Sequence, residues 1–200
     1  MTRPVAGSRG RWRHPGMIHA TPLRRSVPAL AVALMLAATP ASASDRGWDR
    51  ASTIGRDVLV GVALGLPAVR GDWQGDLQAA GSLVATGGAT HALKEIFPET
   101  RPDGSDHKSF PSGHTSIAFA AAGTLENRYG WQAGIPAFVV ASFVGLARVE
   151  ARKHHWYDAV AGAALGTGTA FAITRQRDSA VRLVPWADSG GGGVALVARF

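Results

Sequence analysis

Five long stretches without a charged side chain follow one another along this 200-residue chain. They are residues 58–69, 77–93, 109–125, 129–147 and 159–174. The stretches are rich in Ala, Leu, Val and Gly and do not alternate between apolar and polar residues, so the pattern predicts helices and not strands. Because a chain of this length fits a single domain with its own core, we expect an all-α helical bundle.

The lengths of these stretches leave the surroundings of the bundle open. A helix that crosses a membrane needs about 20 predominantly apolar residues. Only residues 129–147 approach this length, and they include Gln132 and Pro136, while the other long stretches carry Gln, Ser, Thr or His. We expect a bundle that lies in or on a membrane, with the buried helices of a soluble bundle as the alternative.

Charge and cysteine content exclude several classes of function. The formal net charge is +7, but residues 1–43 hold six Arg and no acidic residue, which leaves 15 basic and 14 acidic groups in the remainder. A nucleic-acid-binding domain keeps its basic excess in the folded part, so we expect no nucleic-acid partner. The chain has no Cys, which excludes a disulfide scaffold, a thiolate metal site and a cysteine nucleophile.

Residues 1–43 have the pattern of a secretory signal peptide. A basic segment precedes an apolar run at residues 27–38, and residues 41–43 have the small-x-small pattern that signal peptidase needs. Met17 is an alternative start, and an uncleaved membrane anchor is the alternative interpretation. In either case we expect the rest of the chain to be exported, in the periplasm or in a membrane with its site facing the periplasm.

The C-terminal part of the chain differs from the helical stretches. Two short β-type runs, residues 181–186 and 194–200, flank a segment that contains four successive glycines, which predicts a β-hairpin. The chain therefore divides into a signal peptide (1–43), a helical domain (44–178) and a C-terminal hairpin (179–200).

The helical domain holds three clusters of residues suited to binding an anion. In the first cluster, Lys94 ends an uncharged stretch, and Arg101 lies in the following loop between Pro98 and Pro102. A Lys supplies a point charge and an Arg supplies a planar fork for two phosphate oxygens, so the pair can converge on one anion. A solvated basic loop is the alternative for this cluster taken alone.

The second cluster is Pro111-Ser112-Gly113-His114, at the predicted start of a helix. The first amides of a helix have no partner within it and carry the positive end of its dipole. Gly113 lets a ligand approach the backbone and Ser112 can donate from its hydroxyl, which together make an anion cradle. His114 can exchange a proton with a bound group, and an N-cap Ser with an incidental His is the alternative.

The third cluster runs from Arg148 to Asp158. His154 and Asp158 are four residues apart and share a face if this turn is helical. Asp158 can then accept the N–H of one ring nitrogen and leave the other nitrogen as a nucleophile or base. His155 is the competing candidate. A metal site is a further alternative, but the neighbouring Arg and Lys side chains would repel a cation. The three clusters together predict a metal-free site for phosphoryl transfer, because fixed cations can replace Mg²⁺ in stabilising charge.

The order and spacing of the three clusters resemble the PAP2 (type 2 phosphatidic acid phosphatase) superfamily, which also includes bacterial nonspecific acid phosphatases and vanadium haloperoxidases. The matching motifs are Lys94-x6-Arg101-Pro102, Pro111-Ser112-Gly113-His114 and Arg148-x5-His154-x3-Asp158. The resemblance implies a helical-bundle fold, no metal ion or other cofactor, and His154 as the reactive histidine in place of His155. The chain departs from the family pattern at Ala147, where the family often has Ser.

The resemblance also implies a role for each residue. His154 would attack phosphorus and become phosphohistidine, Asp158 would orient it, and His114 would protonate the leaving oxygen and then activate water. The residues that would hold the phosphate oxygens are Lys94, Arg101, Ser112, Gly113 and Arg148.

We therefore expect a metal-independent phosphatase that hydrolyses phosphomonoesters or diphosphates. The apolar helices favour a phosphorylated lipid as the substrate. The alternatives are a soluble periplasmic acid phosphatase of broad specificity, a vanadate-dependent haloperoxidase, and a binding module on the same scaffold. The sequence leaves the oligomeric state open.

Overall fold

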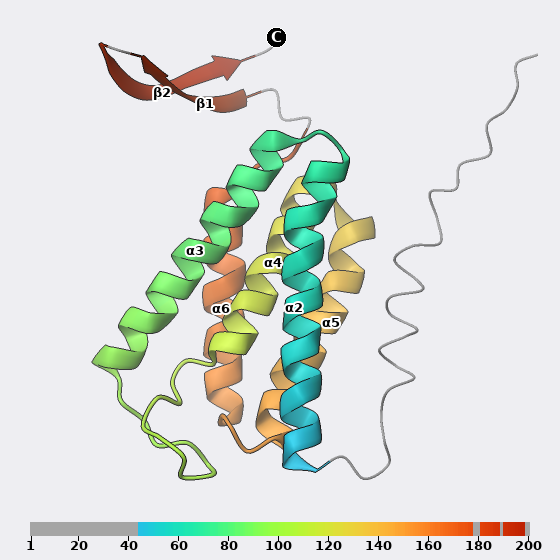
Figure 1. Ribbon diagram of the computed structural model, residues 1–200, viewed down its shortest axis with the longest axis vertical. Coiled ribbons are helices and arrows are strands. Elements are labelled where there is room, and N and C mark those ends of the chain that lie inside the picture. The colour runs from blue at the N-terminus through green and yellow to red at the C-terminus, as the bar shows by residue number, and fades with distance from the viewer. Residues whose placement is uncertain (1–43, 178–180, 189, 199–200) are drawn as a thin grey trace, which may run out of the picture.

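The computed structural model describes residues 44–177, 181–188 and 190–198, and the predicted signal peptide at 1–43 lies outside the described residues. Five helices follow one another in the chain and a pair of strands comes after them (Figure 1). The helices are α2 (Asp45–Val69), α3 (Trp73–Ile96), α4 (Gly113–Tyr129), α5 (Trp131–Glu150) and α6 (Trp156–Ile173). The prediction of an all-α bundle is confirmed.

The strands β1 (Val181–Asp188) and β2 (Gly191–Ala198) form the predicted antiparallel hairpin. Their register pairs Val181 with Ala198 and Asp188 with Gly191. In Figure 1 the hairpin lies beyond one end of the bundle, at the end that also holds the turn between α2 and α3. We call this the turn end of the bundle and the opposite end the site end.

Helix α4 is the centre of the bundle because it packs against each of the other four helices. Its residues 120–125 are all buried, and most of them are Ala, Gly or Thr, so the neighbouring backbones approach closely. On α6, a Cβ atom added at Gly166 would overlap the carbonyl oxygen of Ser116, and one added at Gly162 would lie 2.7 Å from the carbonyl oxygen of Ser112. These glycines allow α6 to lie directly on the first turns of α4.

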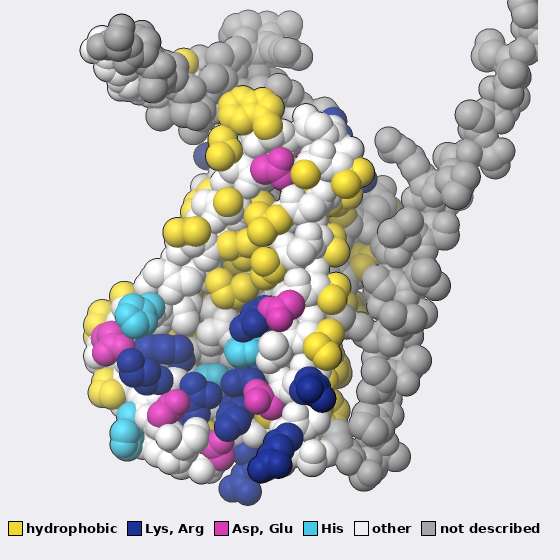
Figure 2. Space-filling view, in the orientation of Figure 1, with side chains coloured by type: hydrophobic (Ala, Val, Ile, Leu, Met, Phe, Trp, Pro, Cys, Tyr) yellow, Lys and Arg dark blue, Asp and Glu magenta, His cyan; other side chains and the backbone are white. Residues whose placement is uncertain are grey.

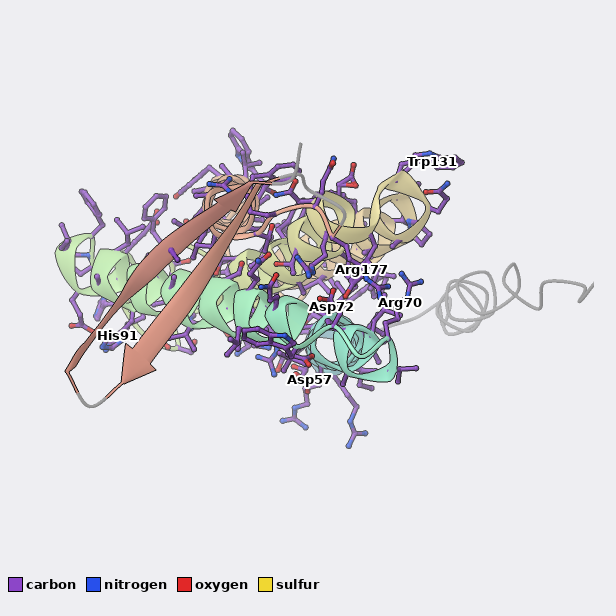
Figure 3. The ribbon with its side chains drawn as sticks, turned by 90° about the horizontal axis from the view of Figure 1, so that it is seen from above. Asp57, Arg70, Asp72, His91, Trp131 and Arg177 are labelled. Carbon is purple, nitrogen blue, oxygen red and sulfur yellow. The ribbon has the colours of Figure 1, made fainter. Side chains whose placement is uncertain are left out.

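A buried ion pair holds the turn end together. Asp72, which follows Gly71 at a φ of +61°, caps α3 through the amide of Gly75. Its carboxylate also accepts hydrogen bonds from Arg128 Nε at 2.7 Å and from the hydroxyl of Tyr129 at 3.0 Å. The side chains of Asp72 and Arg128 are almost completely buried. Figure 3 looks down on this end and shows Arg70, Asp72 and Arg177 close together. The pair therefore fixes the α2–α3 turn to α4.

Apolar side chains cover much of the outside of the bundle. Val58 and Val62 on α2 and Ile135, Val139 and Leu146 on α5 are all exposed. These two helices are long and apolar enough to cross a membrane, by length and composition only. In Figure 2 the hydrophobic side chains lie over the upper and middle part of the molecule, while Lys, Arg and His gather at the site end.

Candidate active site

The three clusters identified in the sequence meet at the site end of the bundle. The loop between α3 and α4, the start of α4 and the segment between α5 and α6 all lie there (Figure 1). The amide of Ser112 donates to the carbonyl of Asp158 at 3.0 Å, and Arg101 Nη1 donates to the carbonyl of Lys153 at 3.4 Å. All eight predicted site residues therefore lie on parts of the chain that come together here.

His154 and Asp158 are the most deeply buried ionisable groups of the site, with exposed fractions of 2% and 0%. His154 Nδ1 lies 3.7 Å from Asp158 Oδ2, which is longer than a hydrogen bond. The sequence predicts that the two residues share a face if this turn is helical, but α6 begins at Trp156, so His154 lies in the preceding turn. His154 Nδ1 and Asp158 Oδ1 have no hydrogen-bond partner among the described residues.

The Asp158 carboxylate is held in place by two strong donors. Its Oδ2 accepts from the hydroxyl of Ser109 at 2.6 Å and from the amide of His155 at 2.8 Å. Burial alone would raise the pKa of Asp158, but the hydrogen bonds to its carboxylate outweigh burial and lower it. Asp158 is therefore a fixed negative charge beside His154.

The protonation of His154 follows from the charges around it. Burial lowers the pKa of the imidazole first, Asp158 opposes this, and the cations Arg148, Arg101 and Lys94 lower the pKa further. The net pKa lies below that of a free histidine. His154 is therefore a neutral imidazole with an available lone pair, which is the form that acts as a nucleophile.

His155, the competing candidate, occupies a different environment. It is half-buried, its ring stacks on Tyr157 at 5.0 Å, and its Nδ1 lies 3.3 Å from Asp158 Oδ2 and 3.6 Å from Glu99 Oε1. Glu99, His155 and Asp158 form the metal-ligand grouping found in the described part of the chain. However, Glu99 already accepts from the Tyr157 hydroxyl and Asp158 already accepts from Ser109. One carboxylate oxygen of each acid is thus engaged in hydrogen bonds within the protein, while Asp158 Oδ1 has no partner among the described residues.

The start of α4 has the features of an anion cradle. Ser112 is the N-cap residue, is fully buried and makes no side-chain cap hydrogen bond to the helix. Its Oγ accepts from the hydroxyl of Thr115 at 2.9 Å, which leaves the Ser112 hydroxyl proton available for a ligand. The first amides of α4 carry the positive end of the helix dipole at the same place.

The cations of the first cluster are held by the loop between α3 and α4. Lys94 Nζ donates to the carbonyls of Lys108 and Pro111 at 2.6 and 2.7 Å. Arg101 Nε donates to Asp106 Oδ1 at 2.7 Å. Burial and the charge of Arg101 lower the pKa of Lys94 to about 8. Both cations are therefore positioned before any ligand binds.

Helix α2 contributes residues to the site that the sequence analysis did not identify. Arg148 Nη1 donates to the carboxylate of Asp49 and to Ser52 Oγ at 3.3 Å. His114 Nε2 lies 3.1 Å from both Thr53 Oγ1 and Arg56 Nη1. The four α2 residues, Asp49, Ser52, Thr53 and Arg56, have the spacing i, i+3, i+4 and i+7, which puts them on one face of the helix. This polar stripe on a largely apolar helix is the signal that could have revealed them.

His114 is unprotonated in this arrangement. A guanidinium can only donate, so Nε2 of His114 accepts the hydrogen bond from Arg56. Burial, followed by the charges of Arg148 and Arg56, lowers the pKa of His114 to about 3. The ring is thus ready to take up a proton when a negative charge arrives.

Comparisons with known proteins extend this description. The sequence profile of the PAP2 superfamily matches residues 76–182. A lipid A 1-phosphatase of Porphyromonas gingivalis is 40% identical over 83 residues, which cover 40% of this chain and 19% of that protein. A lipid A 4'-phosphatase of Helicobacter pylori is 33% identical over 114 residues, which cover 52% of this chain and 58% of that protein. The chain thus spans less than two thirds of the length of each of these relatives.

The fold of a solved structure agrees with the bundle. The crystal structure of Aquifex aeolicus LpxE superposes with a TM-score of 0.58 and 19% sequence identity, over 72% of this chain and 93% of that one. At this identity the likeness concerns the fold alone.

Proposed function

Because this chain belongs to the PAP2 superfamily, we propose that it is a phosphatase that hydrolyses lipid phosphate monoesters or diphosphates through a phosphohistidine on His154. One observation supports this most directly: a buried, neutral imidazole lies beside a fixed carboxylate and is surrounded by three cations. Such a group is a nucleophile placed where a phosphate dianion would be bound.

In the first step, His154 Nε2 would form a bond to phosphorus while the bond from phosphorus to the leaving oxygen breaks. The leaving oxygen would take a proton from His114. Since His114 is unprotonated in the free site, it gains this proton when the charge of the bound phosphate raises its pKa. Asp158 would stabilise the positive charge that develops on the His154 ring.

In the second step, a water molecule would attack phosphorus and break its bond to His154. His114 would accept the proton of this water and would release it to solvent when phosphate leaves, which restores the unprotonated ring of the free site. Inorganic phosphate would then leave, and His154 would be a neutral imidazole again.

The phosphoryl oxygens would be held by fixed positive groups throughout both steps. These groups are Lys94, Arg101, Arg148, the Ser112 hydroxyl and the Gly113 amide. Phosphoryl transfer depends mainly on positioning and charge stabilisation, and preorganised cations supply both. Activity should therefore persist when divalent metal ions are removed.

The proposal of a lipid substrate rests on two observations. The relatives from Porphyromonas gingivalis and Helicobacter pylori are lipid A phosphatases by name. The outside of α2 and α5 is apolar, which suits a protein that associates with a bilayer. We propose that residues 1–43 direct the chain to export, that residues 44–178 form the phosphatase domain, and that the site faces the periplasm.

The test is phosphate release from a panel of lipid and soluble phosphate esters in the presence of EDTA. We expect release by the wild type, a fall of about 10³-fold or more in His154→Ala, and retention of most activity in His155→Ala. The opposite order of the two variants would place the nucleophile at residue 155. Release that is lost in EDTA and restored by Mg²⁺ would contradict the metal-free mechanism, and no release from any ester would contradict the function.

A further inference from the structure

Arg56 is a cation of the site that belongs to none of the three sequence motifs. Helix α2 presents it on the same polar face as Asp49 and Thr53. Its Nη1 lies 3.1 Å from His114 Nε2, and 28% of its side chain is exposed. Its charge acts on both His114 and Arg148, so it lies within the charged centre of the site.

The contact with His114 indicates which side of a bound phosphate Arg56 faces. In the proposed mechanism, His114 delivers a proton to the leaving oxygen. Nε2 is the atom at the tip of the ring, and Arg56 donates to this atom in the free site. A leaving oxygen within hydrogen-bond distance of Nε2 is therefore also close to the Arg56 guanidinium. By contrast, the charges of Lys94 and Arg101 act on His154, the attacking group, while the charge of Arg148 acts on both histidines.

We propose that Arg56 determines specificity by binding a negatively charged leaving group, so that the enzyme prefers a diphosphate over a monoester of an uncharged alcohol. This inference rests on the proposed function. When a diphosphate is cleaved, the terminal phosphoryl group goes to His154 and the leaving group is itself a phosphate. A guanidinium binds phosphate oxygens with two parallel donors, whereas an uncharged alcohol offers it no anion.

Asp57 competes with the substrate for Arg56. Nε and Nη2 of Arg56 both donate to Asp57 Oδ1, at 2.8 and 2.7 Å. The Asp57 side chain is 59% exposed, and an ion pair as exposed as this one contributes little to stability. Arg56 can therefore exchange Asp57 for a substrate phosphate at little cost. Removal of the Asp57 charge should strengthen the preference for a charged leaving group.

The test compares two substrates with the same lipid chain, a prenyl diphosphate and the corresponding prenyl monophosphate. The measured quantity is the ratio of kcat/KM for the diphosphate to kcat/KM for the monophosphate. Arg56→Gln should lower this ratio by about 10- to 100-fold, since it removes a charge-assisted contact made by one leaving group only. Arg56→Lys should lower it less, because the charge remains. Asp57→Asn should raise it by up to about 5-fold.

Arg50→Gln is the matched control, because Arg50 is an exposed arginine on the same helix. The ratio should be unchanged in this variant. If Arg56→Gln leaves the ratio unchanged, the inference is overturned. An equal loss of kcat/KM on both substrates would then mean that Arg56 acts only through His114. Phosphate release by His154→Ala at the rate of the wild type would instead overturn the proposed function. No release from either substrate by the wild type would overturn both the proposed function and this inference.

Discussion

Gly162 on α6 is the position at which one added methyl group tests how closely α6 must lie against α4. A Cβ atom at this position would lie 2.7 Å from the carbonyl oxygen of Ser112 and 3.2 Å from the amide nitrogen of Ser116. Both are backbone atoms of the first turn of α4, joined by the hydrogen bond from the Ser116 amide to the Ser112 carbonyl, and they cannot turn aside as a side chain can. Asp158 lies one helical turn before Gly162, so a shift of α6 moves Asp158 relative to the cradle.

The size of the effect follows from these distances. To reach an ordinary contact distance of 3.4 Å, the backbones of α4 and α6 must separate by about 0.7 Å at Gly162. Overpacking of this kind lowers the free energy of unfolding by about 1–3 kcal/mol. A misplacement of about 1 Å at a catalytic centre costs about 100-fold in rate, so we expect Gly162→Ala to lose about 10-fold or more in kcat.

Gly168→Ala is the matched control on the same helix. Apart from the local backbone of α6 itself, no atom lies within 4 Å of a Cβ atom at this position, so the substitution only removes the conformational freedom of glycine. It should stabilise the protein by about 0.5–1 kcal/mol and leave kcat unchanged. Denaturation followed by circular dichroism and phosphate release measure the two quantities. If Gly162→Ala matched Gly168→Ala in both, the close approach of the two helices would not position the site.

Two other parts of the molecule give further predictions. Arg128→Met should lower the free energy of unfolding by about 3–5 kcal/mol, because it leaves the Asp72 carboxylate buried without its cation. Urea denaturation measures this loss, and a loss below about 1 kcal/mol would contradict the role of the pair. Lys94 is protonated below its pKa of about 8 and neutral above it, so KM for a phosphate ester should rise as the pH passes upward through about 8. Lys94→Arg should abolish this rise because Arg stays charged, and a KM for the wild type that stays constant to high pH would show that Lys94 does not bind the phosphate.

The bundle and the three motifs could be predicted from the sequence because both depend on local patterns. Uncharged stretches mark helices that bury one face, and the residues of each motif lie within a few positions of one another. The start of α2 was missed for the same reason: it carries Asp45, Asp49 and Arg56, so it does not read as part of an uncharged stretch. Asp49 and Arg56 contact the site residues Arg148 and His114.

Contacts between distant parts of the chain were beyond the sequence analysis. Asp49 and Arg148 are 99 residues apart, and no local pattern shows that α2 and α5 bring them together. The geometry of the third cluster also depended on where α6 begins, since His154 and Asp158 share a helical face only if the turn between them is helical. In the structure, His155 and Asp158 form a capping box, so α6 begins only at Trp156 and His154 remains in the turn. A capping interaction thus decides how the predicted nucleophile faces its carboxylate.

The buried pair of Asp72 and Arg128 lies at the opposite end of the bundle from the site, and it anchors the end of α2 from which Arg56 extends. Helix α2 extends from the turn that this pair anchors, and Arg56 lies 14 residues along it from Arg70, or about 21 Å at the rise of an α-helix. A tilt of about 5° at the turn would move Arg56 by about 2 Å over this length. That displacement is enough to break its 3.1 Å contact with His114. The orientation of α2 at this anchored turn therefore affects where Arg56 lies relative to His114 and the substrate.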